Sequence, residues 1–229
     1  MKIYKLMFVS LLFCSSVAYA QFGALKKIGG LGDGDSEAED SASGSSVSAE
    51  ESQEALVLTF KETMTLVITA QSRLQEAVGN SEDAQALQLV IDDLNGDCAK
   101  ECLERTVEVS ASASAAINEK LAAQEALEAE KAEIYMTAIP PYIQGTLKAK
   151  DLATTAADWS KQSLTEIKDA GMMGAGKLKA KLETGTFVAS QMPSLLSSWT
   201  ESTQMVVTFA KSNDMNLDSV EGLNDFDFQ

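Results

Sequence analysis

The chain contains no histidine, only three prolines and few aromatic residues, which make up 6% of its 229 residues. Without histidine, the Ser-His-Asp and Cys-His arrangements of nucleophilic catalysis and every histidine-containing zinc site are excluded. The scarcity of aromatic residues and proline, together with many Ala, Ser, Glu and Leu residues, favours helix over sheet. The length allows one domain of ordinary size.

Basic residues are also scarce: 18 Lys and Arg stand against 34 Asp and Glu, which gives a net charge of −16. This balance excludes a nucleic-acid binder, whose affinity depends on a basic surface. The charge is uneven, because residues 33–138 carry 23 acidic and 6 basic side chains, whereas residues 146–211 carry 6 acidic and 8 basic ones. We favour an intramolecular pairing of these regions; the alternative is that residues 177–181, with three lysines, bind an anionic ligand.

The longest apolar run lies at the N-terminus, where two lysines precede residues 6–13 and a small-residue segment, Val17–Ala20, follows. This order is typical of a secretory signal cleaved after Ala20. The run is shorter than the roughly 20 residues that cross a bilayer, and the bulky Phe13 before Cys14 disfavours a lipoprotein. We therefore expect a periplasmic or secreted bacterial protein.

Only Cys98 and Cys102 remain after that cleavage. Residues four apart on a helix share a face, with Cα atoms about 6 Å apart, so the two can form a disulfide in an oxidising compartment. A redox pair uses the shorter C-x-x-C spacing, and a zinc site needs further ligands that are absent. The sequence favours a structural disulfide over free thiols.

Composition divides the remaining chain into three parts. Residues 21–52 are rich in Gly, Ser, Asp and Glu and predict a disordered acidic linker. Residues 53–212 carry apolar side chains at helical spacing and predict a helical bundle domain. Residues 213–229 are again acidic and predict a flexible tail.

The bundle is predicted to be all-α: an elongated antiparallel arrangement of about five to six helices with one long central helix. Gly79–Asn80 and Asn95–Gly96 end the first two helices. The long helix runs from Asp97 to about Ala138, where Pro140–Pro141 ends it. One face of this helix carries a stripe of residues at helical spacing: Leu103, Val107, Ser110, Ser114, Ile117 and Leu121. The small side chains on this stripe allow close approach of a partner helix.

Beyond the two prolines, a further helix is predicted after Gly145 and a last one that ends near Asn213. Residues 171–193 between them are less regular. Their segment Gly171–Lys177 matches seven of the eight positions of a P-loop, but Leu178 replaces the magnesium-binding Ser or Thr and a helix rather than a strand precedes it. We therefore predict a helix connection and no nucleotide or other cofactor.

Two aspartate runs resemble calcium loops. Asp93, Asn95, Asp97 and Glu104 occupy positions 1, 3, 5 and 12 of an EF-hand-like loop, and the run Asp214–Asp225 repeats that spacing. Both lack the glycine at position 6. Because acidic helix caps and turns produce the same pattern, we favour capping and predict no metal centre.

Catalytic chemistry has no distinctive motif here. No carboxylate pair stands out, and Trp159 and Trp199 lie on apolar stripes typical of a core. The leading hypothesis is a non-catalytic exported helical protein, an interaction or structural module of the bacterial envelope that binds a protein partner or a second copy of itself. The alternatives are a membrane-active, pore-forming type of protein with a hinge at residues 171–176, and a calcium-responsive binder.

Overall fold

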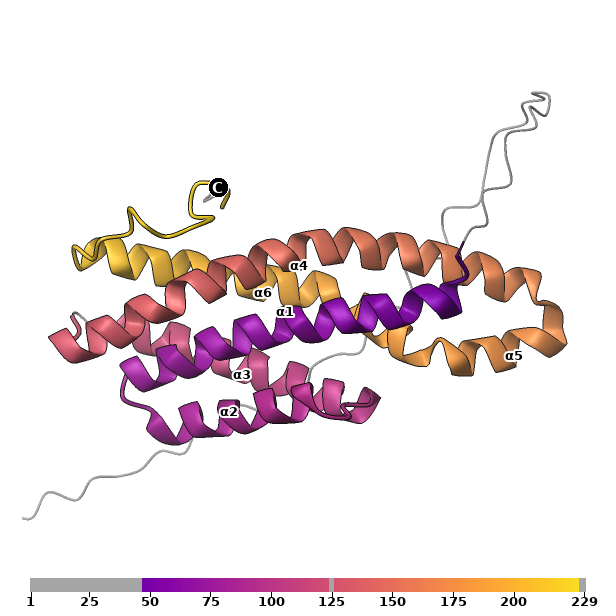
Figure 1. The fold of residues 1–229 in the computed structure, drawn as a ribbon, viewed down its shortest axis with the longest axis horizontal. Helices are drawn as coiled ribbons and strands as arrows, with labels where there is room; N and C mark the ends of the chain where they lie inside the picture. Colours follow the sequence, from indigo (N-terminus) through magenta and orange to yellow (C-terminus); the bar gives the residue numbers. More distant parts are fainter. Residues whose placement is uncertain (1–46, 124–125, 227–229) are drawn as a thin grey trace, which may run out of the picture. The chain divides into compact units, whose positions relative to one another are not determined.

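The computed structural model describes residues 47–123 and 126–226, which form six α-helices (Figure 1). Their bounds are α1 Ala49–Ala77, α2 Ser81–Asn95, α3 Lys100–Ala123, α4 Ala129–Asp169, α5 Gly171–Lys181 and α6 Glu183–Ser212. No strand occurs among these residues, so the all-α class is confirmed for the described part of the chain. The predicted leader, residues 1–20, and most of the predicted linker, residues 21–52, lie outside it.

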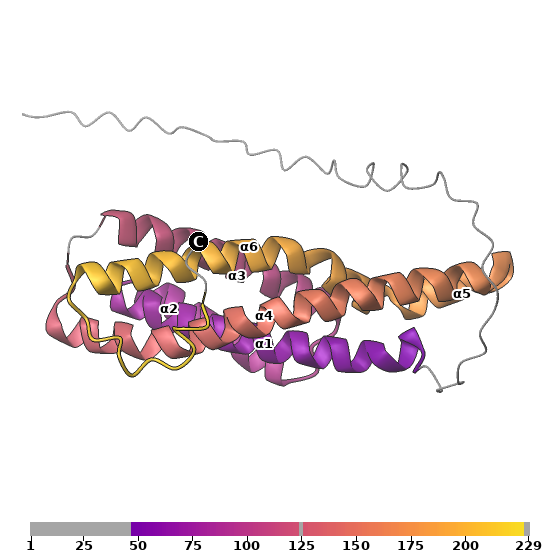
Figure 2. The same ribbon diagram turned by 90° about the horizontal axis from the view of Figure 1, so that it is seen from above.

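The helices pack side by side. Helix α1 packs mainly against α4 and α2, and α6 packs against α4 and α3. Helix α4 runs antiparallel to α1, α3 and α6 (Figures 1 and 2). Fully buried side chains from α1, α3, α4 and α6 form one core, and the largest of them include Trp199, Tyr135, Tyr142, Phe60, Met64, Leu103 and Ile117.

Helix α1 begins at Ala49, four residues before the domain boundary expected at residue 53. A capping box explains this start: the Ser48 hydroxyl accepts a hydrogen bond from the Glu51 amide (3.2 Å), and the Glu51 carboxylate accepts one from the Ser48 amide (2.9 Å). The hydrogen bonds that the Glu51 carboxylate accepts from the Ser48 amide and from the Ser48 hydroxyl (3.0 Å) lower its pKa because they favour its charged form. The helix ends where predicted, with Gly79 at a φ of +88°.

The prediction that Pro140–Pro141 ends a helix is wrong, as is the helix start after Gly145, because α4 passes through all three residues. Pro141 removes the amide that would bond to the Thr137 carbonyl, and Arg73 of α1 donates a hydrogen bond to that oxygen instead (2.7 Å). Tyr135, Ile139 and Tyr142 are fully buried on either side of the prolines. The burial of these side chains and the hydrogen bond from Arg73 offset the free-energy cost of placing two prolines inside a helix.

The predicted long helix from Asp97 to Ala138 is also wrong as a single element. It is divided into α3 and the first part of α4, with non-helical residues 126–128 between them. The reversal between them lets Tyr135 and Ile139 of α4 reach the same core as Leu103 and Ile117 of α3. The longest helix is instead α4, with 41 residues.

The irregular stretch 171–193 is helical as well. Gly171, at a φ of +64°, turns the chain from α4 into α5, and Pro193 lies inside α6. Residues 213–226, expected as part of a flexible tail, form turns in which Leu217 and Phe226 are buried. Gly222 of this segment lies close to Leu147 and Ile143 of α4. These apolar contacts hold the segment against the bundle.

Cys98 and Cys102 form a disulfide with a Cα–Cα distance of 5.3 Å. Because α3 begins only at Lys100, the bond joins the preceding loop to the first turn of the helix. Closing a loop this short removes only a little conformational entropy from the unfolded chain. We therefore expect reduction of the disulfide to lower the free energy of unfolding by only about 2 kcal/mol.

Urea unfolding with and without dithiothreitol measures this effect, and the C98S/C102S double variant serves as the control. The reductant should shift the midpoint of the wild-type protein and leave that of the variant unchanged. An equal shift in both proteins, or none in the wild type, would contradict the prediction.

Candidate functional site

The first aspartate run is not assembled into a cation site. Asp93 and Asn95 lie at the end of α2, Asp97 follows in the loop, and the Asp93 carboxylate lies 3.6 Å from the Arg105 guanidinium. Glu104 forms an ion pair with Lys100 (3.2 Å). Two of the four candidate ligands, Asp93 and Glu104, are therefore paired with cations. No group of three or more Asp, Glu, Cys or His side chains converges on a metal position in the described residues.

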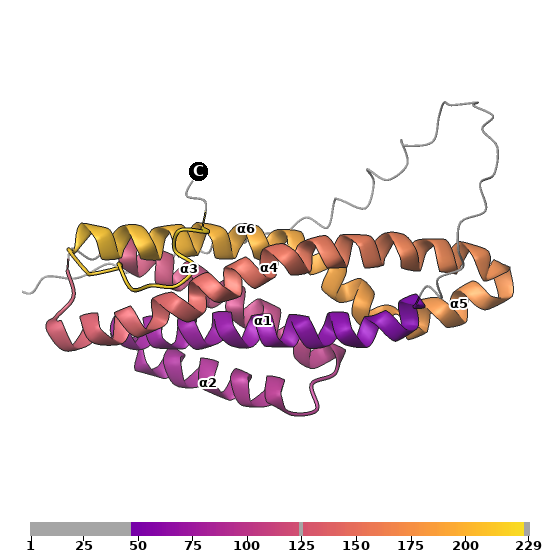
Figure 3. The same ribbon diagram turned by 45° about the horizontal axis from the view of Figure 1, so that its top comes forward.

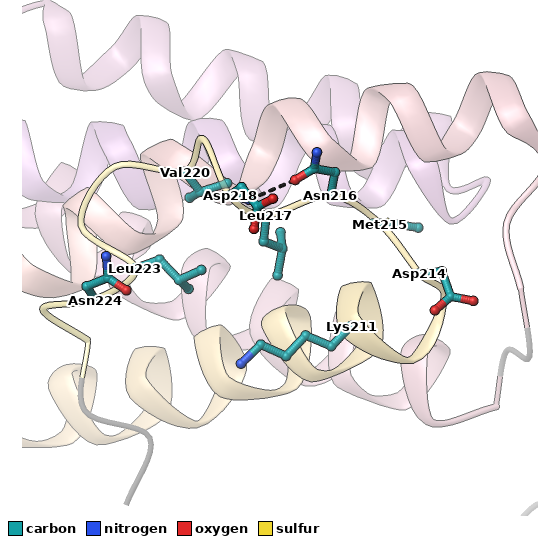
Figure 4. A pocket seen from close by; sticks show the side chains of 9 residues that line it. All are labelled: Lys211, Asp214, Met215, Asn216, Leu217, Asp218, Val220, Leu223 and Asn224. Carbon is teal, nitrogen blue, oxygen red and sulfur yellow. Dashed lines mark hydrogen bonds between the residues drawn. The ribbon is translucent and has the colours of Figure 1, made fainter.

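The second run lines a depression of about 620 Å³ between the C-terminal segment and the end of α6 (Figure 4). Asn216 accepts a hydrogen bond from the Asp218 amide (2.9 Å), which is the turn chemistry that such runs provide. The carboxylate of Asp214 points away from the Asn216–Asp218 pair, and Lys211 extends into the same depression (Figure 4). Asp225 does not line it. Among the residues that the structure describes, these carboxylates do not converge on a common metal position.

Several lysines pair with acidic residues of other helices. Lys181 of α5 contacts Glu50 of α1 (2.8 Å), and Lys148 of α4 contacts Glu62 of α1 (3.0 Å). Lys100 of α3 contacts Glu183 of α6 (2.6 Å), and the hydrogen bonds that its ammonium donates to the carboxylates of Glu183 and Glu104 raise its pKa. These exposed pairs stabilise the bundle little, but they place positive charge beside the acidic helices.

The small-residue stripe of α3 is used inside the molecule. All of its positions except Val107 are buried: Leu103, Ser110, Ser114, Ile117 and Leu121. Trp199 of α6 donates a hydrogen bond to the Ser110 hydroxyl (3.2 Å), and Gln71 of α1 donates to the Ser114 hydroxyl (2.9 Å). The stripe therefore packs against α6 and α1 of the same chain, and most of it is not exposed for contact with another protein.

The buried tyrosine and tryptophan side chains have polar partners inside the bundle. Tyr135 and Tyr142 lie in the core, and burial raises the pKa of both hydroxyls. Tyr135 donates to the Val206 carbonyl (2.8 Å), and Tyr142 lies 3.4 Å from the Ser114 hydroxyl. Neutral phenols with internal partners fix the packing of the helices. Trp159 and Trp199 are buried as well, with Trp159 donating to the Ala49 carbonyl (2.9 Å).

The outer side of the bundle carries an apolar groove between α2 and α3, with a volume of about 300 Å³. Most of the side chains that line it are small or apolar, because both helices place alanine, serine or an aliphatic residue there. Asp83 and Glu108 also line it, and both are exposed. The lining residues are Gln75, Asp83, Ala86, Leu87, Glu108, Val109, Ser112, Ala113 and Ala116.

Sequence reasoning missed this groove. The spacing of Ala86 on α2 and of Ser112 and Ala116 on α3 marks them as small residues, but the sequence does not indicate that α2 and α3 lie side by side. Beyond this groove, Leu89 of α2 is 67% exposed. The surface formed by α2 and α3 is the candidate interaction site.

The described residues form an all-helical fold with an apolar groove on its surface. The chain matches no known protein family, no curated protein and no solved structure. None of the helices in the described residues has the length and apolar character that a membrane span requires.

Proposed function

We propose that the protein is a non-catalytic, exported interaction module of the bacterial envelope, and that it binds an amphipathic helix of a protein partner in the groove between α2 and α3. The groove is the observation that carries the proposal. The signal-like N-terminus supports export, and the acidic segment that precedes α1 would give the bundle reach.

The lining of the groove suggests the chemistry of the partner. Ala86, Ser112 and Ala116 lack bulk, so the larger apolar side chains of an incoming helix can enter between α2 and α3. The exposed carboxylates of Asp83 and Glu108, which also line the groove, favour lysine or arginine beside those apolar side chains. A helix with one apolar face and basic flanks fits both features.

Site-specific photo-crosslinking in intact cells tests this proposal. A benzophenone amino acid at Ser112, an exposed groove residue, should yield a discrete crosslinked species at native expression. The same label at Ala115, which is exposed on α3 but does not line the groove, should not.

A charge placed in the groove supplies the second readout. Ala116→Glu should reduce crosslinking from Ser112 at least about tenfold, because a carboxylate would lose water beside apolar side chains. Ala115→Glu on the same helix should leave it unchanged. Exclusive recovery of monomer from Ser112, a product composed only of two copies of this chain, or equal effects of the two substitutions would refute the proposed partner.

A further inference from the structure

The corner between α4 and α5 exposes two adjacent methionines. Gly171 turns the chain at this corner, and Met172 and Met173 are 99% and 93% exposed. No residue of α5 is buried. In all three ribbon views the corner lies beyond the first turn of α1, at the end of the hairpin that α4 and α5 form (Figures 1, 2 and 3). The two methionine side chains therefore form an exposed apolar tip at the end of this hairpin.

Positive charge surrounds this tip, although the whole chain carries −16. Residues 160–182 contain five lysines and two acidic residues. Glu166, one of the two, is turned inward and accepts a hydrogen bond from the Ala49 amide (2.9 Å), whereas Asp169 is exposed at the tip. Three of the lysines are exposed and form no ion pair within the described residues: Lys168, Lys177 and Lys179.

We propose that this tip, formed by Met172, Met173 and the three lysines, docks onto an anionic phospholipid surface. The thioether side chains enter the boundary between headgroups and acyl chains, and the lysine ammonium groups remain at the level of the phosphates. A deformable lipid interface accommodates an exposed apolar tip without a shaped pocket. None of these tip residues lines the α2–α3 groove, so lipid binding at the tip and partner binding in the groove can be tested separately.

The net negative charge of the protein does not oppose this contact at short range. At physiological ionic strength the screening length is about 8 Å. The headgroups therefore respond mainly to the tip lysines and to Asp169, whereas more distant acidic side chains are screened. The helices would lie at the interface without crossing the bilayer, since no helix in the described part of the chain has the properties of a membrane span.

Vesicle flotation tests the proposal with protein purified after expression of the whole chain. Vesicles of equal parts phosphatidylglycerol and phosphatidylcholine should carry the protein, whereas vesicles of phosphatidylcholine alone should bind it far more weakly. M172S/M173S should reduce partitioning at least about tenfold. K168Q/K177Q/K179Q should reduce it by about fivefold for each lysine removed. These side chains are exposed, so the fold should be retained, and circular dichroism checks this.

Two matched controls and a depth readout complete the experiment. L89S replaces an apolar side chain that is 67% exposed on α2, and K120Q/K150Q removes two exposed lysines away from the tip. Both should change partitioning by less than about twofold. Tryptophan placed by M173W should be quenched by lipids brominated on the acyl chain, since Trp159 and Trp199 are buried.

The proposal is overturned if the wild-type protein remains unbound to the anionic vesicles. It is also overturned if M172S/M173S binds like the wild type, if L89S weakens binding as much, or if acyl-chain bromine leaves the fluorescence of M173W unquenched.

Discussion

Trp199→Ala is expected to lower the free energy of unfolding by about 3–5 kcal/mol, the cost typical of removing a large aromatic side chain from a core. Trp199 is completely buried on α6. Its indole Nε1 donates a hydrogen bond to the hydroxyl of Ser110, which is itself fully buried on α3. The substitution would therefore leave a cavity between helices and remove a buried donor.

Urea unfolding followed by circular dichroism measures this loss. Trp199→Phe removes the donor and part of the indole but keeps a six-membered aromatic ring in the core, so it should cost clearly less than Trp199→Ala. Leu89→Ala, at a side chain that is 67% exposed, should change stability by less than about 0.5 kcal/mol. If Trp199→Ala were as mild as Leu89→Ala, α6 would not pack on α3 as described.

Gly145→Val is expected to lower the free energy of unfolding by about 3 kcal/mol through overpacking. A Cβ at this position of α4 would lie 2.7 Å from Cγ2 of Val67 and 3.3 Å from the Val67 amide nitrogen on α1. The second contact involves backbone, so the two helices would have to move apart. Such a separation would disturb packing between α1 and α4.

Gly176→Val provides the matched control within α5. No heavy atom lies within 4 Å of the Cβ that would be added there. Because valine is also a better helix former than glycine, this variant should retain stability within about 0.5 kcal/mol or gain slightly. Thermal unfolding of the two variants separates the contact between helices from helix propensity. Equal stability of the two would show that α4 does not approach α1 closely at Gly145.

The helix boundaries show where local sequence is sufficient. Gly79 follows the end of α1 as predicted, because its left-handed backbone costs glycine little, and Gly96 follows the end of α2. Pro140 and Pro141 are an equally strong local indication of a helix end, but α4 continues through both residues. Arg73, more than sixty residues away in sequence, supplies the missing hydrogen bond to Thr137, and spacing along the chain cannot reveal such a donor.

The candidate site was less predictable than the fold. The small-residue stripe of α3 predicts a close helix contact, but the sequence does not identify which helix makes it. Ser110 and Ser114 meet Trp199 and Gln71 of the same chain. The α2–α3 groove depends on residues that are unremarkable in sequence, such as Ala86 and Ala116, and that only the packing of two helices brings together.

Composition and periodicity alone determined that this chain is helical, because apolar side chains at 3.6-residue spacing can be buried together only on one face of a helix. They also determined that histidine-dependent chemistry is excluded. The tertiary structure decided that the predicted long helix divides between α3 and α4, that the two prolines lie inside α4, and which surfaces remain uncovered. Those outcomes depend on contacts between residues far apart in the chain, whose free energies exceed the local preferences that sequence patterns report.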